Sequence, residues 1–260
     1  MDNQSNMSQR KTRSVIGMPI DSLSWSEALS RLSLWAAAKE SRYICICNAH
    51  SVVTGRKNPF FAQIINEADM ATPDGAPVAW LMNRLGEGGQ QRINGPDLMW
   101  RYFQDAAIRG ESIYLYGGNQ ETLTLLQEKI DREFPGMKIA GAYSPPYREL
   151  TEAEDNAIVD AINAVCPGTV WVSLGCPKQE KWMAEHRGRI NAVMVGVGAA
   201  FDYHAGTIRR APLWMQLRGL EWFYRLCSEP TRLWRRYLVT NCLFIFYAGR
   251  QLLTTWLKKF

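Results

Sequence analysis

Short apolar segments alternate with amphipathic segments between residues 43 and 197. The apolar runs have the length and composition of buried strands, and they are Tyr43–Cys47, Ser112–Tyr116, Lys138–Ala142, Thr169–Leu174 and Ala192–Val197. The amphipathic segments predict helices near Asn58–Ala68, Asp97–Arg109, Glu121–Phe134, Glu152–Val165 and Lys178–Arg187. This alternation predicts an α/β fold, with a largely parallel sheet and helices on both of its faces. Ligands of such sheets bind at the carboxyl ends of strands, so the loops there are the candidate binding elements.

The C-terminal segment, residues 209–260, differs from the rest of the chain in charge. It holds ten basic and two acidic residues, a net charge of +8, whereas the whole chain carries +5 and residues 1–208 therefore carry −3. Tryptophans lie between its arginines. Arginine binds phosphate bidentately and tryptophan favours the water–lipid boundary, so the segment predicts a phosphate-bearing partner at a membrane surface. A solvated basic helix is the alternative, and nucleic acid is not expected because no nucleic-acid-binding motif accompanies the charge.

The termini and the cysteines favour a cytoplasmic chain. Residues 1–14 are polar and lack the apolar core of a signal peptide, so we expect a flexible tail. The apolar run Tyr237–Gly249 would be about 20 Å long as a helix, too short for a hydrocarbon core of roughly 30 Å, and a helix lying in the membrane plane fits it better. The cysteines show no CxxC spacing, which indicates reduced thiols. Apolar surface on the tail could also meet a partner subunit, so a homo-oligomer stays open.

Two loops place glycine and polar side chains after predicted strands. Gly117, Gly118 and Asn119 connect a strand to a helix, where the backbone can approach a ligand closely and the helix N-terminus favours an anion such as a diphosphate. Gly175 opens a second loop, GCPKQE, whose Gln179 lies where a polar ligand would be held. A plain strand–helix turn is the alternative interpretation of the first loop.

Two further loops carry charged side chains. Asp74 lies in the sequence TPDG, although Asp-Gly after proline is also a common structural turn. Arg92 lies in RINGPD, where it can pair with a phosphate or with Asp74, and Asp97 can cap the helix that follows. The sequence contains neither a GxxxxGK[ST] loop nor a complete GxGxxG fingerprint, which weakens a nucleotide-dependent oxidoreductase as the alternative.

These loops, taken in order, resemble a known family. The segments TPDGAPVAW, RINGPDL, YLYGGNQET, SLGCPKQEKWM, GVGAAFDYHAGTIRRAP and GLEWFYRLCSEPTRLWRRYL are similar to those of the WecG/TagA/CpsF glycosyltransferases, over roughly residues 15–240. The resemblance implies a Rossmann-like catalytic domain at residues 15–208, after the tail at 1–14, and a basic, helical, membrane-associating appendage at 209–260.

The resemblance also implies an activity. The expected reaction is inverting transfer of a sugar from a UDP-sugar to a polyprenyl-diphosphate-linked saccharide, by an enzyme lying peripherally on the inner face of the cytoplasmic membrane. Neither a metal ion nor another cofactor is expected, and the chain has no DxD element of the kind that holds a nucleotide diphosphate through a cation. Arginine and helix N-termini would then neutralise the diphosphate.

Roles follow by resemblance for individual residues. Asp74 matches the family's general base, Arg92 an active-site arginine that steadies the diphosphate, and Gln179 and Asn48 residues of the sugar pocket. Tyr147 and Asp202 match the residues that contact uridine. The appendage is expected to close the site and to meet the lipid diphosphate, and its candidate residues for this role are Arg209, Arg210, Arg218, Arg225 and Arg232.

The donor sugar and one histidine stay open. Departures from the family pattern near His50 and at Ser144–Tyr147 favour an exopolysaccharide hexosyltransferase, specifically a glucosyltransferase, while transfer of N-acetylmannosamine or its uronic acid, as in teichoic acid or common antigen synthesis, is the alternative. His50 is expected to be structural, with an alternative-base role as the competing interpretation. A non-catalytic membrane adaptor that uses only the appendage is a more remote alternative.

Overall fold

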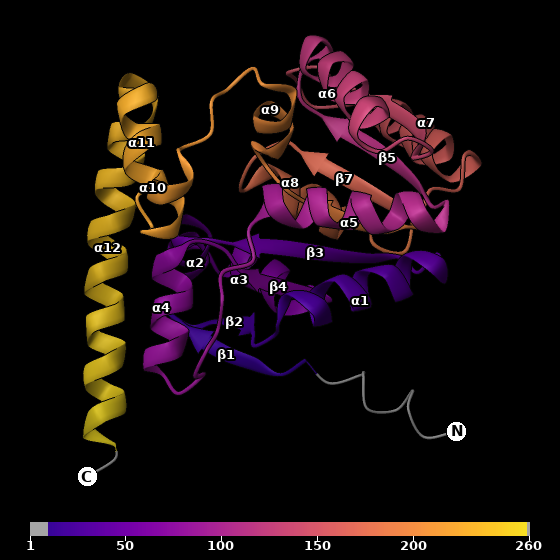
Figure 1. Ribbon diagram of the computed structural model, residues 1–260. Coiled ribbons are helices and arrows are strands. Elements are labelled where there is room, and N and C mark those ends of the chain that lie inside the picture. The colour runs from indigo at the N-terminus through magenta and orange to yellow at the C-terminus, as the bar shows by residue number, and fades with distance from the viewer. Residues whose placement is uncertain (1–9, 259–260) are drawn as a thin grey trace. The chain divides into compact units, whose positions relative to one another are not determined.

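The computed structural model describes residues 10–258 and shows an α/β fold with a six-stranded sheet of order β4-β3-β8-β7-β5-β6 (Figure 1). The strands are β3 (Arg42–Cys47), β4 (Met70–Pro73), β5 (Ser112–Gly117), β6 (Lys138–Tyr143), β7 (Thr169–Ser173) and β8 (Val193–Gly196). The pairs β3–β8, β8–β7, β7–β5 and β5–β6 are parallel. The predicted fold class and all five predicted strands are confirmed. The sequence did not predict β4, because MATP is short and contains only one β-branched residue.

The described chain divides into two compact units. The first comprises the chain up to Ser24, Cys47–Ile93 and the residues from Arg210 onward; the second comprises Trp25–Ile46 and Asn94–Arg209. The predicted boundary between residues 208 and 209 therefore lies next to a unit boundary, whereas the residues expected to form one catalytic domain are shared between the units.

The second unit holds five of the sheet strands and its own helices. These are α1 (Trp25–Ala37), α5 (Gly95–Arg109), α6 (Gln120–Glu133), α7 (Glu152–Ala164), α8 (Lys178–His186) and α9 (Ala200–Ala205). Trp171 of β7 is fully buried, and its ring meets Phe103 of α5 edge-on at 5.2 Å between centroids. Thr151 and Glu154 form a capping box at the N-terminus of α7.

The first unit contains a hairpin of β1 (Thr12–Val15) and β2 (Met18–Asp21), together with β4 and helices. The helices are α2 (Ala49–Lys57), α3 (Pro59–Glu67), α4 (Ala76–Arg84), α10 (Leu213–Leu217), α11 (Glu221–Ser228) and α12 (Pro230–Leu257). Of the tail expected at residues 1–14, residues 1–9 lie outside the described part, and the expectation is wrong for residues 12–14, which form β1. The hairpin turn explains the strand: Ile16 and Gly17 both have positive φ, as a two-residue turn that matches strand twist requires.

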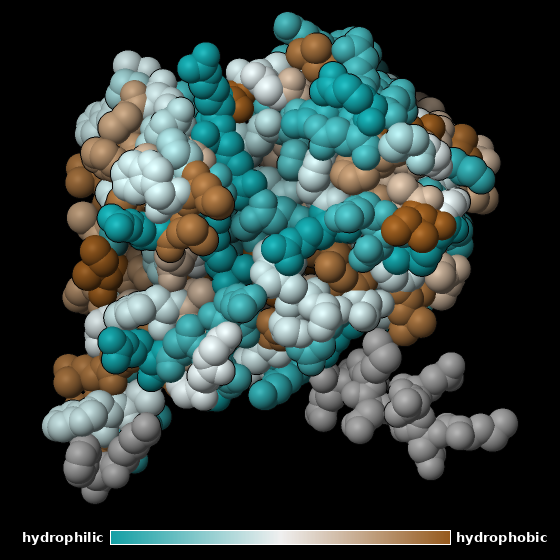
Figure 2. All heavy atoms as spheres, in the orientation of Figure 1, coloured by the Kyte–Doolittle hydropathy of each residue, from teal (hydrophilic) through white to brown (hydrophobic). Residues whose placement is uncertain are grey.

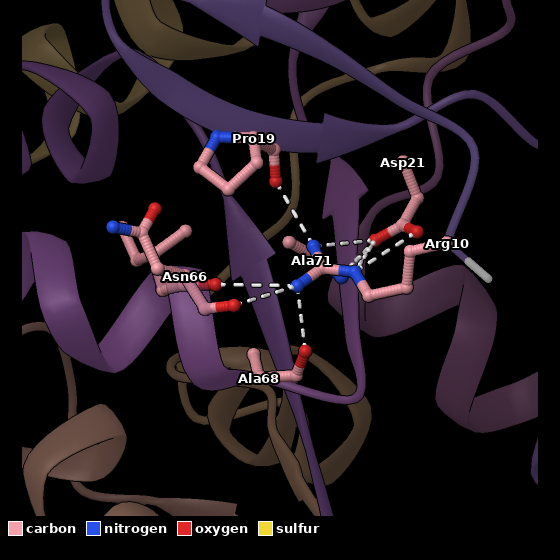
Figure 3. Close-up of polar contacts among 7 residues, drawn as sticks. Arg10, Pro19, Asp21, Asn66, Ala68 and Ala71 are labelled. Atoms are coloured by element: carbon pink, nitrogen blue, oxygen red, sulfur yellow. Dashed lines mark hydrogen bonds and ion pairs between the residues drawn. The ribbon is translucent and has the colours of Figure 1, made fainter. Parts of the chain in front are cut away.

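Arg10 fastens this hairpin to the rest of its unit (Figure 3). Its guanidinium group donates to the Asp21 carboxylate at 2.8 Å, to Pro19 O at 2.9 Å and to Ala68 O at 2.6 Å. Asp21 is buried and accepts a further hydrogen bond from Ala71 N at 2.6 Å. A buried carboxylate is stable only with such partners, so Arg10 and Asp21 form a structural ion pair.

Helix α12 packs on α2 and α11 through a narrow buried face. Leu233, Thr240, Phe244 and Ala248 are buried, and the Gln251 side chain hydrogen-bonds the β1–β2 hairpin, donating to Ser14 O at 2.7 Å and accepting from Ile16 N at 2.8 Å. Across residues 10–258, no helix has both the length and the apolar composition needed to span a bilayer.

Candidate active site

Two clusters of candidate site residues are present, one in each unit. The acid–arginine cluster belongs to the first unit and consists of Asn48, Asp74, Arg92, Arg210 and Glu221. The strand-end cluster belongs to the second unit and consists of Gly117, Gly118, Ser173, Gln179, Gly198 and Asp202. Each cluster is described in its own unit.

Backbone and side-chain hydrogen bonds hold Asp74 at the end of β4. Its N–H donates to Cys47 O at 2.9 Å, and Gly75, with φ +80°, turns the chain into α4. Asn48 caps α2 by accepting hydrogen bonds from the backbone N–H groups of His50 and Ser51, and its side chain also hydrogen-bonds the Asp74 carboxylate. Two chain segments therefore fix the position of this half-buried carboxyl group.

The environment of Asp74 makes its carboxylate a stronger base than usual. Burial, followed by repulsion from Glu221, raises the pKa of Asp74 from 3.8 to about 6, against the opposing effects of Arg92, Asn48 and the Gly75 backbone. A carboxyl group with this pKa is ionised at neutral pH and accepts a proton more readily than an exposed aspartate does. These are the properties of a general base.

Glu221, the first residue of α11, lies between two arginines. Its Oε2 is 3.1 Å from Arg92 Nη1, and its Oε1 is 3.3 Å from Arg210 Nε. From the sequence, Arg92 could pair with a phosphate or with Asp74. The structure shows an electrostatic interaction of Arg92 with Asp74, and it adds an ion pair with Glu221, 129 residues away in the chain. The sequence analysis did not identify Glu221 as a site residue, because the local sequence at residues 219–222 does not indicate which residues the carboxylate contacts.

The other appendage arginines occupy different environments. Glu229 pairs with Arg225, at 4.0 Å, and with Arg232, at 2.6 Å. Arg218 ends α10 and is exposed, and Arg209 is exposed in the second unit. Five appendage arginines were candidates for the site. Among the ion pairs of residues 10–258, only Arg210 of these five pairs with a member of the acid–arginine cluster.

His50 is the second residue of α2, with Nδ1 3.4 Å from Thr240 Oγ1 of α12. Burial and the charge of Arg236 lower its pKa from 6.5 to about 4. The imidazole is therefore neutral at physiological pH and a weaker base than Asp74. This favours the structural interpretation of His50. His204 also has a structural setting, stacking on Trp100 with 3.8 Å between ring centroids.

In the strand-end cluster, the glycine pair after β5 lies directly against β7. Gly117 has φ +110°, and a Cβ there would collide with the carbonyl oxygen of Ser173, while Gly118 N donates to that oxygen at 3.1 Å. Asn119 caps α6 by accepting a hydrogen bond from Thr122 N at 2.7 Å. The predicted glycine loop is thus a tight backbone turn that leads into a capped helix N-terminus.

Gln179 is buried and joins two strand ends. Its Oε1 accepts from Gly198 N, after β8, at 2.9 Å, and its Nε2 donates to Glu180 at 3.1 Å. Its backbone N–H donates to Gly175 O at 3.0 Å, and Ser173 Oγ donates to Gly198 O at 2.7 Å. Gln179 therefore supports the loop after β8, a role that sequence reasoning did not foresee.

The two predicted uridine contacts differ in their surroundings. Asp202, in the first turn of α9, is half-buried, and its Oδ1 lies 3.4 Å from the hydroxyl groups of Thr122 and Thr207. The Tyr147 side chain is 97% exposed. Ser144, close to it in sequence, donates to Gly118 O at 2.7 Å and so ties this loop to the glycine turn. A role for Tyr147 in stacking stays a prediction.

Comparisons with known proteins agree with the expected family. A family model described as "Glycosyl transferase WecG/TagA/CpsF family" matches residues 13–258, which include both clusters. A curated relative from Bacillus spizizenii is 34% identical over 197 residues, covering 75% of this chain and 74% of the relative. One from Staphylococcus aureus strain MW2 is 25% identical over 224 residues, covering 85% and 86%. Both are named N-acetylglucosaminyldiphosphoundecaprenol N-acetyl-beta-D-mannosaminyltransferase.

Proposed function

The chain belongs to the WecG/TagA/CpsF glycosyltransferase family, and we propose that it transfers N-acetylmannosamine from a UDP-linked donor to N-acetylglucosaminyl-diphosphoundecaprenol. The curated relatives are hexosyltransferases, and their names include a lipid-linked acceptor. By membership of the same family, this chain is also a hexosyltransferase. The relatives' names support the N-acetylmannosamine alternative over the glucose donor that the sequence favoured. The exopolysaccharide role has no such support.

The environment of Asp74 is the observation that carries the mechanism. An inverting transfer needs one displacement: the acceptor oxygen forms a bond to the anomeric carbon, the bond from that carbon to the diphosphate oxygen breaks, and UDP leaves with the bonding electrons. The acceptor hydroxyl loses its proton to a base in the same step. Asp74, with its pKa raised to about 6, is suited to take that proton at neutral pH.

The remaining predicted residues supply binding and charge neutralisation in this proposal. Arg92, which already pairs with the carboxylate of Glu221, would neutralise a diphosphate oxygen as charge develops, because guanidinium groups pair well with phosphate. The turn at Gly117 and Gly118 and the N-terminus of α6 offer backbone N–H groups to the donor diphosphate. No metal ion or cofactor enters the mechanism.

A lipid-linked acceptor requires the enzyme to reach a membrane surface, and the appendage has features that support this. Figure 2 shows hydrophobic residues on the face of the first unit that carries α10 to α12. Exposed apolar residues of α12 include Trp234, Leu238, Ile245, Leu253 and Trp256, and they lie away from the buried face of the helix. An interfacial helix combines such residues with basic ones, so we propose that α12 lies on the inner face of the cytoplasmic membrane. A second copy of the chain is the competing occupant of this surface.

A transfer assay tests the proposal. The purified full-length chain is incubated with a short-chain polyprenyl-diphosphate N-acetylglucosamine and, separately, with UDP-N-acetylmannosamine, UDP-glucose and UDP-N-acetylglucosamine, with and without EDTA. We expect UDP release and a disaccharide product with UDP-N-acetylmannosamine alone, unchanged by EDTA. A product with UDP-glucose alone would overturn the sugar assignment, and no UDP release with any donor would favour the adaptor.

A further inference from the structure

The Glu221 carboxylate occupies a position between two cations that is suited to a phosphate. Each of its oxygens faces a different guanidinium group, at 3.1 Å for Arg92 and 3.3 Å for Arg210. All three side chains are 21% exposed, so the pairs are partly desolvated but still accessible. Two guanidinium groups that converge on two oxygens of one anion form an arrangement that binds a phosphate equally well.

The helix that carries Glu221 has few other attachments. No residue of α11 is fully buried, although residues 224–226 are half-buried, and its main packing is on its neighbours α10 and α12. The backbone comes close to α4 at Gly219, two residues before the helix begins, where a Cβ would lie 2.6 Å from Ala76 Cβ. Moving Glu221 off its arginines therefore costs little buried apolar surface, and the two ion pairs are the main interaction to be replaced.

The electrostatics of the cluster also allow an exchange of anions. Glu221 is near enough to Asp74 to raise the pKa of that carboxyl group, so the cluster already accommodates a second negative charge beside its general base. Asp74 and Glu221 together balance Arg92 and Arg210. An additional diphosphate would add its charge to that of both carboxylates, whereas a diphosphate that displaces Glu221 takes the place of one of them.

We propose that Glu221 is a stand-in anion, which occupies the phosphate position between Arg92 and Arg210 in the unliganded enzyme and yields it to a substrate diphosphate. This proposal rests on the proposed function for the identity of the ligand, a diphosphate of the UDP donor or of the lipid-linked acceptor. The proposal adds to that function a carboxylate of the chain itself that competes with the diphosphate for the two arginines. The returning carboxylate would also expel the diphosphate after transfer, so Glu221 would speed product release.

If Glu221 is a stand-in anion, replacing it should tighten diphosphate binding, whereas replacing a residue that supports the arginines should weaken it. Glu221→Gln removes the competitor and leaves both arginines, so diphosphate should bind roughly threefold to tenfold more tightly, which is the range for two part-exposed ion pairs. KM should fall, and kcat should fall with it because the product dissociates more slowly. If Glu221 merely held the arginines in place, the same variant would bind diphosphate more weakly and KM would rise.

Glu229→Gln is the matched control. Glu229 lies in the same segment, pairs with two arginines, and is 24% exposed against 21% for Glu221. Isothermal titration calorimetry of both full-length variants and the unmodified enzyme would use four probes: inorganic pyrophosphate, UDP, uridine and a short-chain polyprenyl diphosphate. Circular dichroism would check folding, and Glu221→Ala, which also removes the charge, would replace Glu221→Gln if that variant does not fold.

The outcomes separate the two possible diphosphates. Tighter binding of UDP by Glu221→Gln but not by Glu229→Gln, with uridine unchanged, supports the stand-in role for the donor diphosphate. Tighter binding of the polyprenyl diphosphate alone supports it for the acceptor. Unchanged or weaker binding of every diphosphate, or equal tightening in both variants, overturns it. These binding results do not depend on which sugar is transferred, so failure of the proposed sugar specificity would be seen separately in the transfer assay.

Discussion

Replacing Asp74 by asparagine should abolish transfer and stabilise the fold. The amide has nearly the shape of the carboxyl group but cannot accept the acceptor proton, and loss of a general base costs about 10²- to 10⁴-fold in rate. The same carboxylate is held where burial and Glu221 disfavour its charge. An asparagine in its place carries no charge, so the variant loses the base and also the penalty of ionising it.

The size of the stabilisation follows from the pKa. A rise from 3.8 to about 6 is roughly two units, and at about 1.4 kcal/mol per unit this gives an upper limit of about 3 kcal/mol. Because Asp74 keeps some contact with solvent, we expect about 1–3 kcal/mol. Well below pH 3.8 the carboxyl group is protonated in both the folded and the unfolded chain, so the penalty is absent there. The penalty grows as pH rises from 3.8 to 6 and is nearly complete above pH 6.

Urea unfolding of both proteins at pH 4, 6 and 8 measures this difference, with transfer assayed at pH 8. Asp131→Asn, at an exposed position of α6, is the control for a change of one charge and should leave stability nearly unchanged. His50 also titrates in this range, with its pKa near 4, but it is present in both proteins and its contribution cancels. The reasoning is refuted if Asp74→Asn is less stable than the parent at pH 8, or if it transfers sugar within tenfold of the parent rate.

Three further predictions test other parts of the structure. Gly117→Ala should destabilise the fold by about 2–3 kcal/mol and Gly118→Ala by less, because both glycines have positive φ but only a Cβ at Gly117 would meet backbone atoms. Thermal unfolding compares the two variants, and equal losses of stability would contradict the close approach at Gly117. Arg10→Ala should lower the free energy of unfolding in urea by about 3 kcal/mol, because it leaves the buried Asp21 carboxylate without its cation. Arg13→Ala should cost about 1 kcal/mol, because the ion pair of Arg13 is more exposed, and the reverse order would count against the structural ion pair. Ile245→Lys should weaken flotation with anionic vesicles without unfolding the chain, since this side chain is 71% exposed, and unchanged flotation would argue against α12 as the membrane-facing helix.

The parts of the fold that the sequence predicted are those with strong local periodicity. Strands β3 and β5 to β8 are runs of apolar residues, and their helices have capping or glycine signals near the expected ends. The missed strands are short, and the predicted helix of the appendage is longer than its apolar run indicated. β1 and β2 are four-residue strands that pair only with each other, and α12 is 28 residues long although only Leu233, Thr240, Phe244 and Ala248 are buried.

The candidate site was predicted as a set of residue types but not as a set of contacts. Asp74, Arg92, Asn48 and Gln179 were recognised by resemblance, yet the hydrogen bonds that position them were not readable from their loops. Ser173 shows why: its carbonyl receives Gly118 N and its hydroxyl reaches Gly198 O, and both contacts depend on strand register. Register between distant strands is set by the whole sheet, so no local sequence pattern reveals it.

Glu221 links the chemistry of the first unit to its flexibility. A single carboxylate pairs with Arg92, which follows β4 in the chain, and with Arg210, which lies at the start of the first unit's C-terminal segment, and it raises the pKa of Asp74. No residue of α11 is fully buried, and besides its packing on α10 and α12 the helix is held by these two ion pairs. An anion that binds the two arginines would therefore change both the charge around Asp74 and the hold on α11. Substrate binding and appendage movement would then be two consequences of one exchange of ion pairs.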